Sequence, residues 1–226
     1  MATKYSPKTV TNGLVLSLDA ANTKSYPKSG TTWADLSGNS NTGTLTNGPT
    51  FNAANMGGIV FDGSDDYCRV QNFTSMNVQG PGTVTYWGKF SNLGSAGVPK
   101  TALTITNGLG TSALQVGLRD AQGIVWKAGG VTLLSYNTPT LNRITQWTLT
   151  FDNSNLQMYI DGRLTNSTTS AVAQTATAAD FYLATYRTDA SEAFSGTIYS
   201  SAVYNRVLTA SEVLQNYNAT KSRFGL

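Results

Sequence analysis

A central stretch of the chain alternates between apolar and polar side chains twice in succession. Apolar residues alternate with threonines over residues 147–151, and the alternation resumes over residues 156–160. This period of two is expected of strands that bury one face. Turn-forming residues occupy positions 152–155, and Asp161-Gly162 closes the second run. The stretch therefore predicts a β-hairpin whose apolar side needs a second sheet to cover it.

Short runs of the same kind, bounded by Gly, Asn, Asp and Ser, recur through the rest of the chain. Their regular spacing favours an antiparallel sandwich, and no change of composition divides the chain. We therefore expect one domain over residues 1–226, with residues 1–12 as an N-terminal arm. The further strands are expected at residues 13–19, 57–61, 67–70, 83–90, 101–106, 113–118, 123–127, 131–136, 181–186 and 196–208.

One helix is expected near the C-terminus, over residues 209–222. Thr209 and Glu212 have the spacing of a capping box, in which each side chain binds a free backbone amide of the first turn. Val213, Leu214 and Tyr217 supply an apolar stripe at helical spacing.

The composition excludes several classes of function. Charged residues make up only 12% of the chain and the net charge is +3, without a basic block, so we expect no nucleic-acid partner. No apolar run is long enough to span a membrane, and the N-terminus lacks the apolar core of a signal peptide. A surface of neutral hydroxyls and amides suits a virion or extracellular protein, which would here be made in the host cytoplasm.

The long polar segment over residues 20–50 needs apolar anchors, and we assign that role to Trp33 and Leu36. Trp33 could instead be a stacking platform for a sugar, but a buried plug is the favoured interpretation. The single cysteine, Cys68, lies in an expected strand and is interpreted as a small buried hydrophobe.

Several segments together resemble laminin-G-like, concanavalin A-like jelly-roll domains: residues 18–22, 33–39, 61–67, the central hairpin, and residues 196–209 with the capped helix. The resemblance is closest to the version found in tailed-phage (cyanophage-like) virion proteins and marine bacterial surface proteins. It implies an all-β, concanavalin-like jelly-roll β-sandwich of two antiparallel sheets with one short C-terminal helix. It also implies a structural virion protein, such as a head decoration, fibre or other appendage, that forms homo-oligomers and contacts capsid or tail proteins.

The available chemistry does not favour an enzyme. The chain has no histidine, which removes the usual Ser-His-Asp, Cys-His and zinc sites. Related glycoside hydrolases place two glutamates close together, whereas Glu192 and Glu212 are the only glutamates here and Glu212 is expected in the helix cap. We therefore predict that the chain is not an enzyme, and a hydrolase remains only a third alternative.

The second functional alternative is a lectin-like module that binds a host-surface glycan. Sugar sites combine an aromatic face with nearby polar oxygens, and the candidates are Trp126, Tyr136, Tyr186 and Asp189.

A calcium site is an alternative for Asp62, Asp65 and Asp66, because Ca²⁺ prefers several oxygens on a tight loop. Their position in a turn favours the simpler interpretation that these carboxylates bind their own backbone. No other cofactor is expected.

Overall fold

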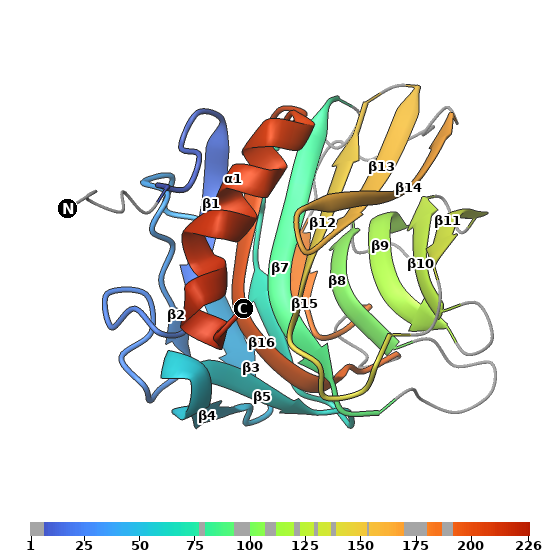
Figure 1. Ribbon diagram of the computed structural model, residues 1–226. Coiled ribbons are helices and arrows are strands. Elements are labelled where there is room, and N and C mark those ends of the chain that lie inside the picture. The colour runs from blue at the N-terminus through green and yellow to red at the C-terminus, as the bar shows by residue number, and fades with distance from the viewer. Residues whose placement is uncertain are drawn as a thin grey trace.

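The computed structural model describes residues 7–76, 80–92, 100–106, 112–119, 123–128, 131–136, 139–152, 154–169, 180–186 and 192–226. They form two antiparallel 8-stranded sheets packed face to face, with one α-helix outside them (Figure 1). The expected all-β sandwich with a short C-terminal helix is confirmed.

Sheet A has the order β14-β13-β12-β7-β16-β5-β4, with β1 also paired to β16. Its strands are β1 (Leu14–Asp19), β4 (Thr50–Asn52), β5 (Gly58–Asp62), β7 (Gly82–Phe90), β12 (Thr145–Phe151), β13 (Asn155–Ile160), β14 (Arg163–Thr169) and β16 (Ser195–Tyr204).

Sheet B has the order β11-β10-β9-β8-β15-β6-β3-β2. Its strands are β2 (Thr32–Trp33), β3 (Gly43–Thr46), β6 (Tyr67–Val70), β8 (Lys100–Thr106), β9 (Ser112–Arg119), β10 (Gly123–Ala128), β11 (Val131–Tyr136) and β15 (Asp180–Leu183). Outside the sheets lie α1 (Ala210–Thr220) and the 3₁₀ turns η1 (Ala54–Met56) and η3 (Lys221–Phe224).

The central hairpin forms as expected. β12 pairs with β13 so that Leu149 lies opposite Met158 and Phe151 opposite Leu156. These side chains are buried in the core between the sheets. Burying such side chains is worth about 1.5–3 kcal/mol each, which is why the apolar alternation of this stretch is so regular.

β7 buries both of its faces. Tyr86 lies in the core, whereas Trp87 packs under the helix against Tyr217 and Phe224, with ring centroids 5.6 Å and 4.5 Å away. The sequence pattern here suggests a bulge near Gly88. The register shift instead lies on the neighbouring strand β16, between Ile198 and Ser200, opposite Gly88 and Trp87.

The two expected loop anchors behave differently. Trp33 is fully buried, as the plug interpretation predicts, and Cys68 is buried in the same core. Leu36 is 38% exposed, so its expected role as an anchor is wrong. The backbone holds this loop instead: the Leu36 amide donates to the Ser17 carbonyl at 2.8 Å, along the free edge of β1.

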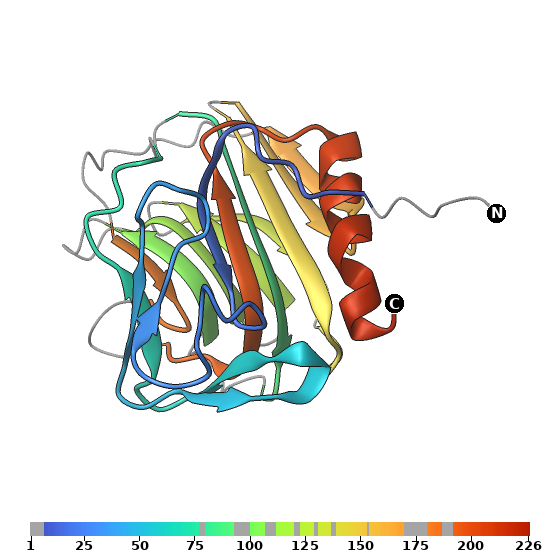
Figure 2. The same ribbon diagram turned by 90° about the vertical axis from the view of Figure 1, so that its left-hand side faces the viewer.

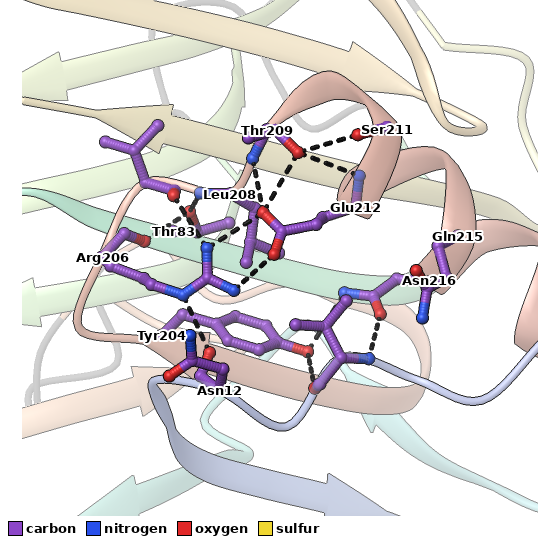
Figure 3. Close-up of polar contacts among 12 residues, drawn as sticks. Asn12, Thr83, Tyr204, Arg206, Leu208, Thr209, Ser211, Glu212, Gln215 and Asn216 are labelled. Atoms are coloured by element: carbon purple, nitrogen blue, oxygen red, sulfur yellow. Dashed lines mark hydrogen bonds and ion pairs between the residues drawn. The ribbon is translucent and has the colours of Figure 1, made fainter.

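Helix α1 lies on the outer face of sheet A, the face turned away from sheet B (Figure 2). The expected capping box is present: the Glu212 amide donates to the Thr209 hydroxyl, and the Thr209 amide donates to the Glu212 carboxylate. Arg206 also donates to both carboxylate oxygens of Glu212, at 2.9 Å and 2.6 Å (Figure 3). Within the described residues, no helix is long and apolar enough to cross a membrane.

Candidate functional site

Helix α1 covers only part of sheet A, and a polar cleft lies beside it on the same outer face. The floor of this cleft is set by the register of four adjacent strands. Asp19, Ser200, Trp87 and Gln146 lie directly opposite one another on β1, β16, β7 and β12. Directly paired residues of antiparallel strands point to the same side of the sheet, so these four side chains form one row.

A second row lies two residues further along the same strands. It consists of Ser17, Ala202 and Thr85. Both rows line a cavity of about 250 Å³, which we call the outer-face cleft. Such a volume is below the usual range for drug-sized ligands and suits a single sugar-sized molecule.

The walls of the outer-face cleft come from segments far apart in the sequence. The lining includes Asn216 and Thr220 of α1, Thr9 of the N-terminal segment and Leu36 of the loop after β2. The side chain of Leu36, wrongly expected to be an anchor, is therefore part of the rim.

The helix wall is rigidly held, because its polar groups satisfy one another. The Asn216 side chain accepts from the Val10 amide at 2.8 Å and donates to the Tyr204 hydroxyl at 3.1 Å. Tyr204 in turn donates to the Val10 carbonyl at 3.0 Å, and burial raises the pKa of its phenol (Figure 3). The Trp87 indole donates to the Thr220 hydroxyl at 2.9 Å. Such a wall is preorganised for binding.

Gln146 differs from these neighbours. Its side chain is on the cleft lining and the residue is only 3% exposed, yet its Oε1 has no hydrogen-bond partner in the described part of the chain. Buried polar atoms of native proteins are nearly always paired. An unpaired one in a cavity wall indicates a place where a ligand completes the bonding.

Among the described residues of its lining, the outer-face cleft has one charged side chain, Asp19. One oxygen of this carboxylate accepts from the Ala21 amide at 2.9 Å and from Arg223 at 2.8 Å. The remaining polar side chains are hydroxyls and amides. This set can donate to and accept from the hydroxyl groups of a neutral ligand.

Three of the four residues predicted as a sugar site lie in the described part of the chain. Trp126 lies on β10 opposite Leu134 of β11, and Tyr136 lies two residues further along β11, opposite Ile124. Tyr186 follows β15 and is half-buried, and Asp189 is outside the described residues. These four residues therefore stay a prediction.

The outer-face cleft was missed because its floor residues are ordinary ones in the sequence. Ser17, Ser200 and Gln146 occur in separate strands, and nothing local distinguishes them from other surface serines and glutamines. The only sequence signal for these residues was that they are polar residues in strands whose alternate residues are apolar and buried, which places them on the outer face of the sheet.

The second candidate site, the acid turn formed by Asp62, Asp65 and Asp66, has the expected local bonding. Ser64 donates its amide to Asp62 at 2.7 Å, and Asp62 donates its amide to Asp66 at 3.1 Å. Carboxylate oxygens of the three residues also lie within 4.8 Å of one another.

The electrostatics of the acid turn are consistent with a cation. Burial raises the pKa of the Asp66 carboxyl, the bond from the Asp62 amide opposes this shift, and the charges of Asp62 and Asp65 add to it. Three oxygens of this kind fit a hard cation such as Ca²⁺, which remains a prediction.

The families and solved structures that are similar to this chain have the same concanavalin-like fold. The family described as the concanavalin A-like lectin/glucanases superfamily (Laminin_G_3) matches residues 62–214. No curated protein matches the chain.

Three solved structures illustrate the similarity of fold. Trypanosoma rangeli sialidase in complex with the inhibitor DANA is 17% identical with a TM-score of 0.74, over 97% of this chain and 36% of that one. Domain 4 of AbnA, a GH43 extracellular arabinanase from Geobacillus stearothermophilus in complex with arabinotriose, is 19% identical with a TM-score of 0.69, over 90% and 98%. The binding domain of Paraclostridial Mosquitocidal Protein 1 is 17% identical with a TM-score of 0.66, over 92% and 52%.

These similarities correct the prediction that the chain is not an enzyme. The chain spans about a third of the length of the sialidase chains that it matches, and at 17% identity the likeness shows the fold alone. The fold nevertheless occurs within chains that are glycosidases. The prediction was wrong because it searched for one arrangement, a close pair of glutamates, and sialidases are among the exceptions to that arrangement.

Proposed function

Because the chain belongs to the concanavalin A-like lectin/glucanases superfamily, we propose that it is a lectin-like module that binds carbohydrate in the outer-face cleft. The observation that carries this proposal is the floor of the cleft. Two half-buried serines, Ser17 and Ser200, lie there beside a glutamine whose carbonyl oxygen has no partner. Sugars are recognised by fixed polar groups of this kind, and the helix wall holds these in place.

One of the similar structures supports carbohydrate as the ligand. It is a domain of an arabinanase in complex with arabinotriose. That domain is almost wholly covered by the match, so the shared unit is the domain itself and not a fragment of it.

This proposal is tested by comparing, on a glycan array, the native chain with a variant whose cleft is filled. Ser200→Leu puts a branched apolar side chain on the floor and should abolish binding of the glycans that the native chain retains. Ser167→Leu makes the same replacement on the exposed face of β14, outside the cleft, and should leave binding unchanged. Both variants are first shown to melt cooperatively. Equal binding by Ser200→Leu and the native chain would contradict the proposal, and so would an array without hits.

Bound glycans should also be assayed for release of reducing sugar. The glycosidase chains among the similar structures make this assay necessary. Release that the Ser200→Leu change abolishes would assign hydrolysis to the same cleft.

A second proposed role is structural, within a tailed-phage virion. Its support is the resemblance of residues 18–22, 33–39 and 61–67 to the phage version of this domain. Edge strands such as β4 and β14 carry backbone groups that no strand pairs within the described residues, and such edges can bind neighbouring subunits. Detection of the chain in purified particles, as an oligomer, would support this role. A monomer that fails to associate with particles lacking its gene would contradict it.

A further inference from the structure

Among the described residues that line the outer-face cleft, Tyr86 and Gln146 each have a buried polar atom without a hydrogen-bond partner. Tyr86 belongs to the core between the sheets, whereas Gln146 lies on the outer face, and this allows the ligand to be specified. We propose that the Gln146 carboxamide is the specificity-determining contact of the cleft and that its ligand is an uncharged sugar unit, without a carboxylate. This inference rests on the proposed function, because it takes the cleft to be the carbohydrate site.

Gln146 contrasts with Gln157, a second glutamine on the outer face of sheet A. Gln157 accepts hydrogen bonds from the Tyr159 hydroxyl at 2.8 Å and the Thr150 hydroxyl at 3.4 Å. Gln146 Oε1 has no partner in the described part of the chain, although Gln146 also lies on a paired strand of sheet A. The fold can therefore satisfy a glutamine on this face, and Gln146 is the exception.

Gln146 lies at one end of the floor row, beside Trp87, and Ser200 and Asp19 follow on the next strands. A hydroxyl or amide group of the ligand can donate to the Gln146 carbonyl. The oxygen and nitrogen of a carboxamide are assigned from their hydrogen bonds. Either atom can form a hydrogen bond with a sugar hydroxyl, because a hydroxyl both donates and accepts.

Asp19 is the one charged side chain among the described residues of the lining, and Arg223 already pairs with it at 2.8 Å. A ligand carboxylate would lose water without gaining a cation in the cleft. A ligand cation would find a carboxylate that is already paired. A neutral sugar avoids both penalties, so the cleft should discriminate against sialic and uronic acids.

Two matched pairs of sugars test the charge of the ligand. Glucose with glucuronic acid, and galactose with galacturonic acid, differ only in the carboxylate at C6. Binding is measured by ligand-observed NMR at millimolar concentration, beside an array that holds neutral, acidic and amino glycans. We expect at least one neutral glycan to bind, and neutral members to bind about tenfold or more tightly than their acidic partners.

The variant Gln146→Met tests whether the Gln146 carboxamide binds the sugar. Methionine keeps the unbranched shape and removes the unsatisfied amide, so we expect binding to weaken about tenfold while Tm rises by about 2–4 °C. The control is Gln157→Met, which should leave sugar binding unchanged and lower Tm because it leaves the Tyr159 hydroxyl without its partner. A purely structural glutamine would lower Tm when replaced and would not affect affinity.

The outcomes separate this inference from the proposed function. Binding in the cleft with a preference for acidic glycans would overturn the inference and leave the function standing, as would neutral binding that Gln146→Met does not weaken. An array without any bound glycan would overturn both. Weakened binding by Gln146→Met together with a higher Tm would support both.

Discussion

The outer face of sheet A contains two neighbouring regions that differ in how their polar groups are satisfied. In the helix anchor, formed by Val10, Tyr204, Arg206, Glu212 and Asn216, the polar groups bind one another in two sets. Val10, Tyr204 and Asn216 form one set, and Arg206 and Glu212 form the other. In the outer-face cleft, a buried carbonyl oxygen lacks any partner in the described part of the chain. The first arrangement is typical of groups that stabilise a fold, and the second of groups kept for a ligand.

The two regions also differ in the packing that supports them. Trp87 lies at their boundary: its ring stacks on Tyr217 at an interplanar angle of 17°, and its indole binds Thr220 at 2.9 Å. The helix therefore depends on apolar packing and on its cap, while the cleft depends on the rigidity that the helix provides.

The largest effect is expected for Trp87→Ala, which removes the packing of the helix on the sheet. Burial of this side chain is nearly complete, and truncating such residues costs about 3–5 kcal/mol. Urea unfolding measures the loss, with Leu164→Ala as the control, because Leu164 is 53% exposed and should change stability by about 0.5 kcal/mol or less. A loss below about 1 kcal/mol for Trp87→Ala would mean that the helix is not held by packing.

A moderate effect is expected for Glu212→Gln, which removes the charge of the helix cap. The Arg206 guanidinium, with bonds from Thr209, lowers the pKa of the Glu212 carboxyl from 4.5 to about 2. A carboxyl with a depressed pKa stabilises the fold above its ordinary pKa, and this contribution is lost as the pH falls. We expect the variant to be about 1–2 kcal/mol less stable near neutral pH.

The pH dependence separates the charge from the shape of the side chain. The difference in unfolding free energy between native chain and Glu212→Gln should narrow as the pH falls from 4.5 to about 2. Urea titrations at several pH values measure it. A difference that stays constant over this window would show that the Arg206 pair contributes nothing through charge.

The smallest effect is expected at the acid turn, where three carboxylates approach one another. If Ca²⁺ binds there, EDTA should lower Tm and excess Ca²⁺ should restore it, with a stabilisation on the order of 1 kcal/mol at a few-fold excess over Kd. Asp65→Asn is the matched variant, because the bonds to the backbone come from Asp62 and Asp66 and would remain. A melt that neither EDTA nor Ca²⁺ changes would end the calcium prediction.

The fold was predictable from local patterns, because each strand must bury one face. The alternation over residues 147–160 and the pair Thr209 and Glu212 carry information that does not depend on distant contacts. β7 was ambiguous because its two faces are covered by different layers, so Tyr86 and Trp87 are both buried. The alternation of apolar and polar residues cannot show which face of a strand is turned to the core when both faces are apolar and buried.

The candidate site was not predictable from local patterns. Its floor depends on the register of β1, β16, β7 and β12, which lie far apart in the sequence. Leu36 illustrates the same limit: an apolar residue in a polar loop suggested an anchor, but the loop is held by backbone bonds and the side chain is on the rim of the cleft. The sugar prediction selected aromatic residues by their local sequence, whereas the cleft combines Trp87 with hydroxyl and amide side chains from separate strands and from the helix.

The most direct test is an NMR titration of the labelled native chain with the neutral glycan that binds best on the array. We expect the side-chain amide signals of Gln146 and the backbone signals of Ser17 and Ser200 to shift together and to saturate with one affinity. Shifts confined to sheet B, around Trp126, Tyr136 and Tyr186, with the Gln146 signals unmoved, would contradict the assignment of the outer-face cleft as the carbohydrate site.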